Sequence, residues 1–269
     1  ISKRLQGLPD NTPTPACTSS IGWQSLPAKV IISKLMLLWQ LLTLPMSNVY
    51  KKITVIRLIF AQYFTLHSLS PLGDCLKVAK AYRLDEAIYG ILNGESVSKS
   101  SWKRQVKFAI EEFETSKWSL NCLAYENLTL FKTVHQFIKP LIWWQLAKKD
   151  PGTLRNCRLM VILLTGGGAL MTNVKRWSGG LESDLCMVCK LAPETLQHLI
   201  LDCSGHVNER IEILNICKKL FPNQPLPPSS VLLPIIFGAD SILCDVEYDI
   251  ICKSVYKMYL NRPKNRYFT

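Results

Sequence analysis

Four residues in the C-terminal half of this 269-residue chain, Cys186, Cys189, His198 and Cys203, follow the spacing C-x2-C-x8-H-x4-C. Two thiolates separated by two residues can turn toward one ion across a tight turn, and a histidine and a third cysteine can complete a tetrahedral shell. Four protein ligands leave no position for water, so such an ion would stabilise the fold and would not activate a nucleophile. The spacing therefore predicts a structural Zn²⁺ site.

The alternative is that these cysteines are buried thiols that pack as small hydrophobic side chains. Ten cysteines in one chain produce some C-x2-C pairs by chance, but here the pair, the histidine and the third cysteine fall within 18 residues. The remaining cysteines are scattered, mostly in apolar stretches, and we expect them in the core. His206 is the substitute ligand that the sequence offers.

A helix is expected between the two halves of the array. Pro193 suits the first position of a helix, and Glu194 suits a first helical turn. Apolar residues then recur at helical spacing, at Leu196, Leu199 and Ile200. The pattern predicts a helix that begins near Pro193.

This helix has to be short if both of its ligands are to reach one ion. At about 100° per residue, His198 and Cys203 would lie roughly 140° apart around a continuous helix. We therefore expect the helix to end by about Asp202, where Ser204-Gly205 supplies a stop. Asp202 lies one turn after His198, and we predict that it accepts the second ring N–H of that ligand.

The run LCMVCKLAPETLQHLILDCSGHVNER, residues 185–210, resembles the zinc-binding (CCHC) segment at the C-terminal end of reverse transcriptases from LINE-type (non-LTR) retrotransposons. Glu194-Thr195 stands in the matching place between the cysteine pair and the histidine. The similarity extends upstream to LQGLPDNTPTPA near the start, to SKSSWKRQVKFAIEEF over 98–113 and to the helix expected before Gly166. Residues 18–27 and the triple glycine at 166–168 depart from the pattern, as in a decayed copy.

The resemblance implies a C-terminal fragment in which a helical connector precedes a zinc module. In an intact relative this region would help to hold RNA or DNA against the parent polymerase domain. The chain has no adjacent aspartates to hold polymerase metal ions, no phosphate-binding P-loop, no G-x-S-x-G and no H-E-x-x-H. We therefore expect no catalytic residue and no small-molecule substrate.

The predicted fold class is mainly α. Long apolar runs or apolar residues at helical spacing fall near 27–44, 47–66, 71–92, 100–118, 126–148, 152–165, 193–203, 207–221 and 243–260. Turn-forming residues suggest boundaries at Asp150-Pro151-Gly152 and over 222–230. We expect a basic helical connector over 1–150, a zinc-binding module over 151–221, and a linker with a C-terminal helix over 222–269.

Positive charge is concentrated in the N-terminal part. The formal net charge is +12, and residues 1–110 carry 14 Lys or Arg against 5 Asp or Glu. Lysine and arginine can neutralise phosphates, and an aromatic ring can stack on a base. The predicted contacts to RNA or DNA are Lys103, Arg104, Lys107 and Trp102, with Lys175, Arg176 and Trp177 just before the zinc array. Basic helical faces are also common as solvated surface.

The run from Val30 to Leu44 is almost continuously apolar. It is shorter than the roughly 20 residues that a membrane-spanning helix needs, it contains Lys34, and Pro27 and Pro45 bound it. We expect a buried or partner-facing helix and no membrane association. This run also supports the alternative function, a zinc-stabilised protein-interaction module without a role on nucleic acid.

The expected compartment is intracellular, either nuclear or cytoplasmic. The chain begins at Ile1, and no basic and apolar leader follows. Reduced cysteines suit metal binding better than disulfides.

Overall fold

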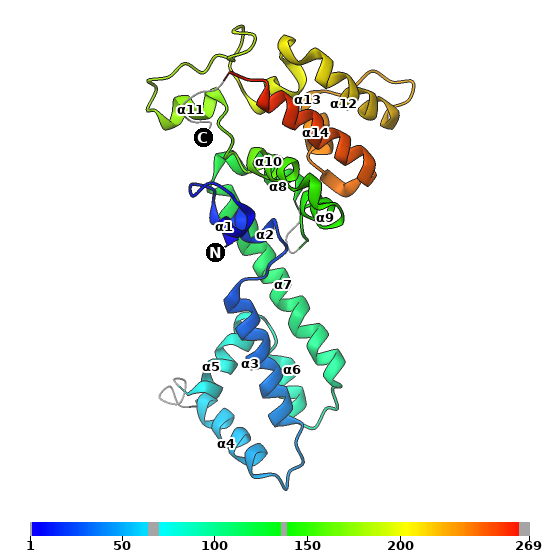
Figure 1. Cartoon of the computed structure of the whole chain (residues 1–269). Helices are drawn as coiled ribbons and strands as arrows, with labels where there is room; N and C mark the ends of the chain where they lie inside the picture. The colour runs from blue at the N-terminus through cyan, green and yellow to red at the C-terminus, as the bar shows by residue number, and fades with distance from the viewer. Residues whose placement is uncertain (1, 64–69, 136–138, 264–269) are drawn as a thin grey trace. The chain divides into compact units, whose positions relative to one another are not determined.

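The computed structural model describes residues 2–63, 70–135 and 139–263, and over these residues the chain is mainly helical with no β-strand. It divides into two compact units (Figure 1). The inserted unit is Gln24–Trp118, and the terminal unit combines Ile1–Trp23 with Ser119–Thr269. This division differs from the predicted boundaries at 150 and 221, because helices on both sides of each boundary pack together in the terminal unit.

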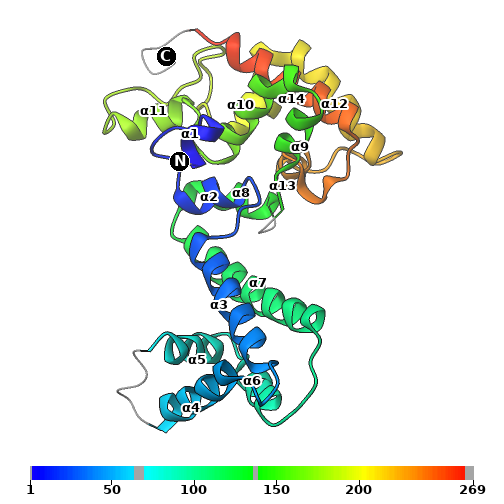
Figure 2. The same ribbon diagram turned by 60° about the horizontal axis from the view of Figure 1, so that its bottom comes forward.

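The inserted unit is a bundle of short helices around α3. Its elements are α3 (Leu26–Leu42), α4 (Val49–Tyr63), α5 (Pro71–Ala81), α6 (Asp85–Leu92) and the first part of α7 (Lys99–Leu123). Helix α3 contacts α4, α5 and α6 and lies among them (Figure 2). The expected helix over 71–92 is divided in two, because Arg83 adopts a left-handed conformation with φ 55°.

Helix α3 contains the apolar run that begins at Val30. Ser25 caps its N-terminus by accepting a hydrogen bond from the backbone N–H of Ala28 at 3.2 Å. Leu35, Leu38 and Leu42 are buried at helical spacing and form the centre of the core. The run is therefore mainly a core helix, which is the first of the two alternatives predicted for it.

The terminal unit is built around the last helix of the chain. Its α-helices are α1 (Ser2–Gln6), α2 (Thr14–Ser19), α8 (Thr129–Val134), α9 (Ile142–Lys149), α10 (Leu154–Leu164), α11 (Met171–Trp177), α12 (Val207–Leu220), α13 (Ser229–Ile236) and α14 (Asp245–Leu260). Helix α14 packs against α9, α10 and α12, and it lies beside α12 in both views (Figures 1 and 2). Tyr248, Ile251 and Val255 supply its buried face.

The predicted helix positions agree with the structure where apolar residues recur at helical spacing over a long stretch of sequence. The expected segment 126–148 contains a break before α9, where Pro140 forms an isolated bridge with Ile21. The short helices α1, α2, α11 and α13 were not predicted, because a run of five to eight residues shows little periodicity. Parts of the expected segments, 64–66 and 136–138, lie outside the described residues.

None of the helices within the described ranges is both long and apolar enough to span a bilayer.

Candidate metal centre

The cysteine pair lies on a tight hairpin-like loop. The two arms of this loop are joined by a bridge between Leu185 and Pro193 and by a hydrogen bond from Cys186 N–H to Ala192 O at 2.8 Å. At the tip, Lys190 N–H donates to Cys186 O at 2.8 Å, and Lys190 has a left-handed φ of 59°. This turn directs Cys186 and Cys189 to the same side of the loop, as the C-x2-C spacing predicts.

His198 and Cys203 come from a single wide turn. Thr195 Oγ1 accepts a hydrogen bond from His198 N–H at 3.0 Å, and the helical residues begin at Leu196. A π-helical turn, η4 (His198–Asp202), follows. Cys203 N–H donates to His198 O at 2.7 Å and closes the turn between the two ligands.

The expected helix start at Pro193 is wrong, and so is the place given to Glu194 in a first helical turn. Pro193 lies in the bridge with Leu185, and Glu194 N–H donates to Asp184 O at 2.8 Å. The hairpin arm thus continues through Glu194 before the helix can begin. The expected end at Asp202 agrees with the structure, because Cys203 has extended backbone angles.

The four side chains converge. One ligand atom from each of Cys186, Cys189, His198 and Cys203 lies within 4.8 Å of the others. The Sγ atoms of Cys186 and Cys203 are 3.7 Å apart, and Cys189 Sγ is 3.2 Å from His198 Nε2. Two sulfur ligands about 2.3 Å from Zn²⁺ at the tetrahedral angle stand about 3.8 Å apart. The donor set of three thiols and one imidazole therefore fits Zn²⁺ in chemistry and in spacing.

The surroundings of the cluster shift the pKa values of Cys203 and Cys189 in opposite directions. Burial, with a smaller effect of the nearby Cys186, raises the pKa of Cys203 to about 12. For Cys189 burial acts in the same direction, but hydrogen bonds from the Leu191 backbone and the neighbouring thiols hold its pKa below the ordinary value. A bound cation would favour the thiolate form of every cysteine in the cluster.

Arg210, on the first turns of α12, supports the π turn from behind. Its Nε donates to Ile200 O at 2.9 Å, and its Nη2 donates to Cys203 O at 2.5 Å. The side chain is buried, and its guanidinium holds one carbonyl within the turn and the carbonyl that follows the turn. Nothing in the spacing of the array indicated this residue, because its partners are backbone atoms.

A buried ion pair connects the segment that carries the Cys/His cluster to the end of α14. Glu194 Oε2 accepts hydrogen bonds from Arg262 Nη1 at 3.1 Å and from Met171 N–H at 2.8 Å. Both charged side chains are essentially inaccessible, at 0% for Glu194 and 1% for Arg262. Arg262 also lies over the Tyr259 ring, with 3.9 Å between its Cζ and the ring centroid. Sequence reasoning missed this pair, whose members are separated by 68 residues.

Asp202 and His206, which were predicted as a partner of the His198 ring and as a substitute ligand, both lie near the cluster. Asp202 Oδ2 accepts a hydrogen bond from Gln197 Nε2 at 3.1 Å, and among the described residues its carboxylate accepts none from the His198 ring, which was its predicted partner. His206 is buried, which lowers its pKa, but it lies outside the group of four converging side chains.

The basic residues predicted on α7 face solvent. Lys103, Arg104 and Lys107 are exposed and line a shallow depression of about 410 Å³ together with Phe108. Trp102 is fully buried, and its Nε1 donates to Leu35 O at 3.0 Å. The prediction that Trp102 stacks on a base is therefore wrong. It belongs to the inward stripe of the helix, whereas the 70% exposed Phe108 lies among the cations.

The other predicted contacts lie on the last turn of α11. Lys175 Nζ forms an ion pair with Asp184 Oδ2 at 3.0 Å, and Arg176 Nη2 donates to Asn173 Oδ1 at 3.1 Å. Trp177 is partly exposed and lines a cavity of about 590 Å³ in the terminal unit.

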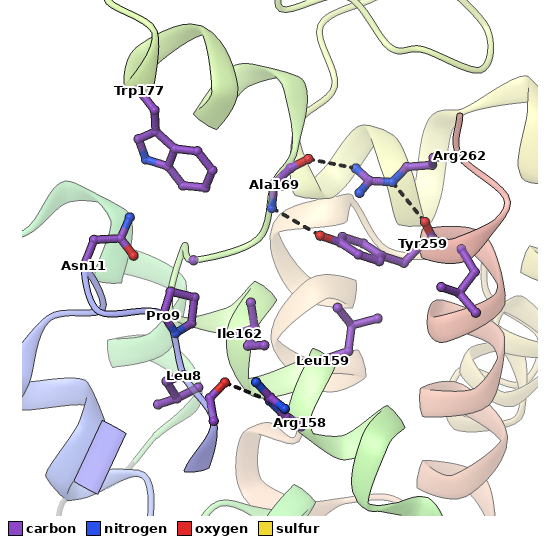
Figure 3. Close-up of a pocket in the computed structure, with 13 residues that line it drawn as sticks. Leu8, Pro9, Asn11, Arg158, Leu159, Ile162, Ala169, Trp177, Tyr259 and Arg262 are labelled. Atoms are coloured by element: carbon purple, nitrogen blue, oxygen red, sulfur yellow. Dashed lines mark hydrogen bonds between the residues drawn. The ribbon is translucent and has the colours of Figure 1, made fainter. Parts of the chain in front are cut away.

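Polar and aromatic groups from distant segments surround this cavity (Figure 3). Trp177 and Asn11 lie on one side of it, and Tyr259 and Arg262 lie on the other. Arg158 forms part of its base, where its Nε donates to Gly7 O at 2.7 Å. The cavity thus combines the indole ring of Trp177, the side-chain amide of Asn11 and the guanidinium of Arg158, which its bond to Gly7 holds in place.

Comparisons with models of known protein families, with curated proteins and with solved structures each found no match.

Proposed function

We propose that this chain is a non-catalytic, nucleic-acid-binding C-terminal region of a LINE-type reverse transcriptase, stabilised by one Zn²⁺. The observation that supports this most is the convergence of Cys186, Cys189, His198 and Cys203. Zinc held by four protein ligands contributes to folding free energy and leaves no coordination position for substrate. Cysteine ligands also have to be reduced, which suits an intracellular compartment.

The metal assignment is tested by measuring zinc in protein purified without added metal. The wild type should hold one Zn²⁺ per chain, and Cys189→Ser should hold none. Cys244→Ser is the matched control, because Cys244 is exposed and lies outside the cluster. The assignment would be contradicted if the wild type held no zinc and if a chelator did not change its thermal unfolding. Structural zinc contributes on the order of 10 kcal/mol to folding, so its removal should have a large effect.

The nucleic-acid role is supported by the exposed cations of α7. Lys103 and Lys107 lie four residues apart and form no ion pair within the described part of the chain. Cations that neutralise phosphates of a single strand give a salt dependence with a slope of about −0.7 per phosphate. The proposal concerns single-stranded RNA or DNA, whose bases are open to stacking.

The test is fluorescence anisotropy of a labelled single-stranded oligonucleotide at several salt concentrations. Lys103→Gln combined with Lys107→Gln should weaken binding and flatten the slope by about 1.4. Lys218→Gln combined with Lys219→Gln removes the same charge from exposed positions on α12 and should leave the slope unchanged. Equal effects of the two double variants would indicate a response to net charge alone.

The cavity in the terminal unit offers a place for one unpaired nucleotide. Trp177 supplies a stacking surface, Asn11 an amide and Arg158 a cation for phosphate. Trp177→Ala should therefore lower oligonucleotide affinity by roughly 5- to 100-fold. Trp177→Phe should retain most of the affinity, and both variants should keep their zinc.

A further inference from the structure

Helix α4 has two apolar faces on opposite sides. One face carries the buried Thr54 and Leu58 and packs against α3 and α5. The opposite face carries apolar residues that remain exposed: Val49 64%, Ile53 45%, Ile56 53%, Phe60 42% and Tyr63 72%. Most helices on the surface of a protein bury one apolar stripe and present polar residues on the other side. The second face of α4 therefore needs a separate explanation.

Tyr50 and Ile59 are also exposed on α4, but the five residues named above form a narrow seam. Their spacing alternates between four and three residues, which is the heptad pattern of helices that pair with another helix. At about 100° per residue the five side chains cover about 80° of the helix circumference. We call this set the α4 seam, and over the 15 residues of α4 it is about 22 Å long. Its length and width match a single partner helix.

Cations flank the seam on both sides. Lys52 lies at one edge and Arg57 at the other, and both are exposed. Neither residue forms an ion pair with any described residue. In heptad terms they occupy the g position and the following e position, where charges select the partner of a helix pair. Tyr50 and Ile59 extend the apolar surface beyond these cations.

A second copy of this chain is a poor partner for the seam. In a parallel pair of α4 helices, Lys52 of one copy would face Arg57 of the other, and α4 contains no Asp or Glu to relieve the repulsion. An antiparallel pair would also bring only cations together. A helix with Asp or Glu at its e and g positions would instead meet an opposite charge on each side.

A lipid surface fits the seam less well than a helix does. Helices that lie in a membrane interface carry their cations on the polar face, opposite the apolar face that enters the lipid. In α4 the opposite face is buried in its own unit, and the cations lie at the edges of the seam. The heptad spacing and the position of the charges both favour a helical partner.

We propose that α4 binds an amphipathic helix of a partner protein whose apolar seam is flanked by aspartate or glutamate. Apolar contacts along the α4 seam would supply affinity. Lys52 and Arg57 would supply selectivity for an acidic partner. This interaction surface lies in the inserted unit and does not depend on the nucleic-acid role.

The probe is a pair of synthetic 21-residue helical peptides with leucine at every a and d position. One carries Glu at its e and g positions, and the other carries Lys. Calorimetric titration of the full chain should show that the Glu peptide binds at least tenfold more tightly. Lys52→Glu combined with Arg57→Glu should invert this preference, and an inversion cannot result from partial unfolding.

Substitutions within the seam test its location. Ile53→Gln combined with Ile56→Gln should lower the affinity for the Glu peptide at least tenfold while thermal unfolding stays the same. Leu120→Gln combined with Leu123→Gln is the matched control, because these leucines are 69% and 65% exposed on α7. The control variant should bind the peptide as the wild type does.

Three results would overturn the proposal. The first is equal binding of the Glu and Lys peptides to the wild type. The second is sedimentation as a dimer that the Ile53/Ile56 variant loses, which would assign the seam to a second copy. The third is binding to phosphatidylserine vesicles that the same variant loses while the wild type ignores both peptides, which would assign the seam to lipid.

Discussion

Glu194 shows how one side chain can serve a different purpose from the one that its local sequence suggests. Following a proline and preceding apolar residues at helical spacing, it has the pattern of a first helical turn. In the structure its carboxylate is buried and bonded to Arg262 and to the first N–H of α11. The segment with the Cys/His cluster, α11 and the end of α14 are therefore joined through this residue.

The first prediction concerns the buried pair. Arg262→Met should lower the free energy of unfolding by about 3–5 kcal/mol, because it leaves the Glu194 carboxylate buried without its cation. Urea unfolding measures this difference. Lys253→Met is the control, since it breaks the exposed ion pair with Asp249 and should change stability by less than about 1 kcal/mol. Similar small effects for both variants would contradict the prediction.

The second prediction concerns His135, which is buried in the terminal unit. Burial lowers its pKa to about 4, although a backbone hydrogen bond with Ser19 opposes the shift. An unfolded histidine titrates near 6.5, so between about pH 6.5 and 4 the unfolded chain binds the proton that the folded chain excludes. Stability is retained above this window and is lost through it as pH falls, by an amount on the order of 3 kcal/mol.

His135→Gln removes this component of the acid sensitivity. Urea unfolding at pH 7 and at pH 4.5 should show a smaller loss for the variant than for the wild type. Carboxylates titrate in both proteins, so the comparison isolates the histidine. Parallel losses in the two proteins would show that His135 does not carry this dependence.

At the scale of elements, α7 separates two roles that its sequence mixes. Trp102, Val106 and Ile110 form its buried stripe, and the cations at Lys103 and Lys107 face outward with Phe108. The indole of Trp102 has its hydrogen bond to α3 and is part of the core. An aromatic residue within a basic helix is therefore assigned by its position in the helical period.

The third prediction follows from this separation. Trp102→Ala should destabilise the protein by about 3–5 kcal/mol, as truncation of a buried aromatic side chain does. Phe108→Ala should leave stability within about 0.5 kcal/mol and lower the affinity for single-stranded oligonucleotides, by roughly 5-fold or more. Urea unfolding and anisotropy measured on both variants test the two halves. A loss of stability in Phe108→Ala would contradict the assignment of this ring to the surface.

The wide turn η4 is the element that completes the Cys/His cluster. Its i→i+5 hydrogen bond, from Cys203 N–H to His198 O, lets two ligands five positions apart face one point. Arg210 holds the Ile200 carbonyl within the turn and the Cys203 carbonyl just after it. An α-helical turn would place the same residues at different angles around its axis.

At the scale of the whole molecule, the chain folds as two compact units, and the four converging Cys and His side chains belong to the terminal unit. The core of the inserted unit is formed by residues from within Gln24–Trp118. The pairing of Glu194 with Arg262 and the packing of η4 on α14 both lie in the terminal unit. The loss of zinc should therefore act on one unit first.

The fourth prediction is a local response to chelation. After zinc removal, amide hydrogen exchange should increase in peptides from 166–220 and 245–263, which carry the cluster and its supports. Peptides from α3, α5 and α6 should keep their protection, because their contacts lie in the other unit. Mass spectrometry resolves the two sets in one sample. A uniform increase throughout the chain would contradict independent stabilisation of the units.

The sequence alone determined the features that depend on local spacing. The four converging ligands could be predicted because a Cys pair, a His and a Cys within 18 residues need only one loop and one turn to meet. The mainly helical fold could be predicted from the apolar period, since each long helix carries its own stripe. The outward position of Lys103 and Lys107 follows from the same period.

Only the tertiary structure decided features that depend on distant partners. The buried pair of Glu194 and Arg262 could not be predicted, because burial of a charge requires a counter-charge that the fold brings from 68 residues away. The exposed seam of α4 has the same cause. Its sequence is apolar on two sides, and only packing against α3 and α5 selects which side becomes core and which remains open to a partner.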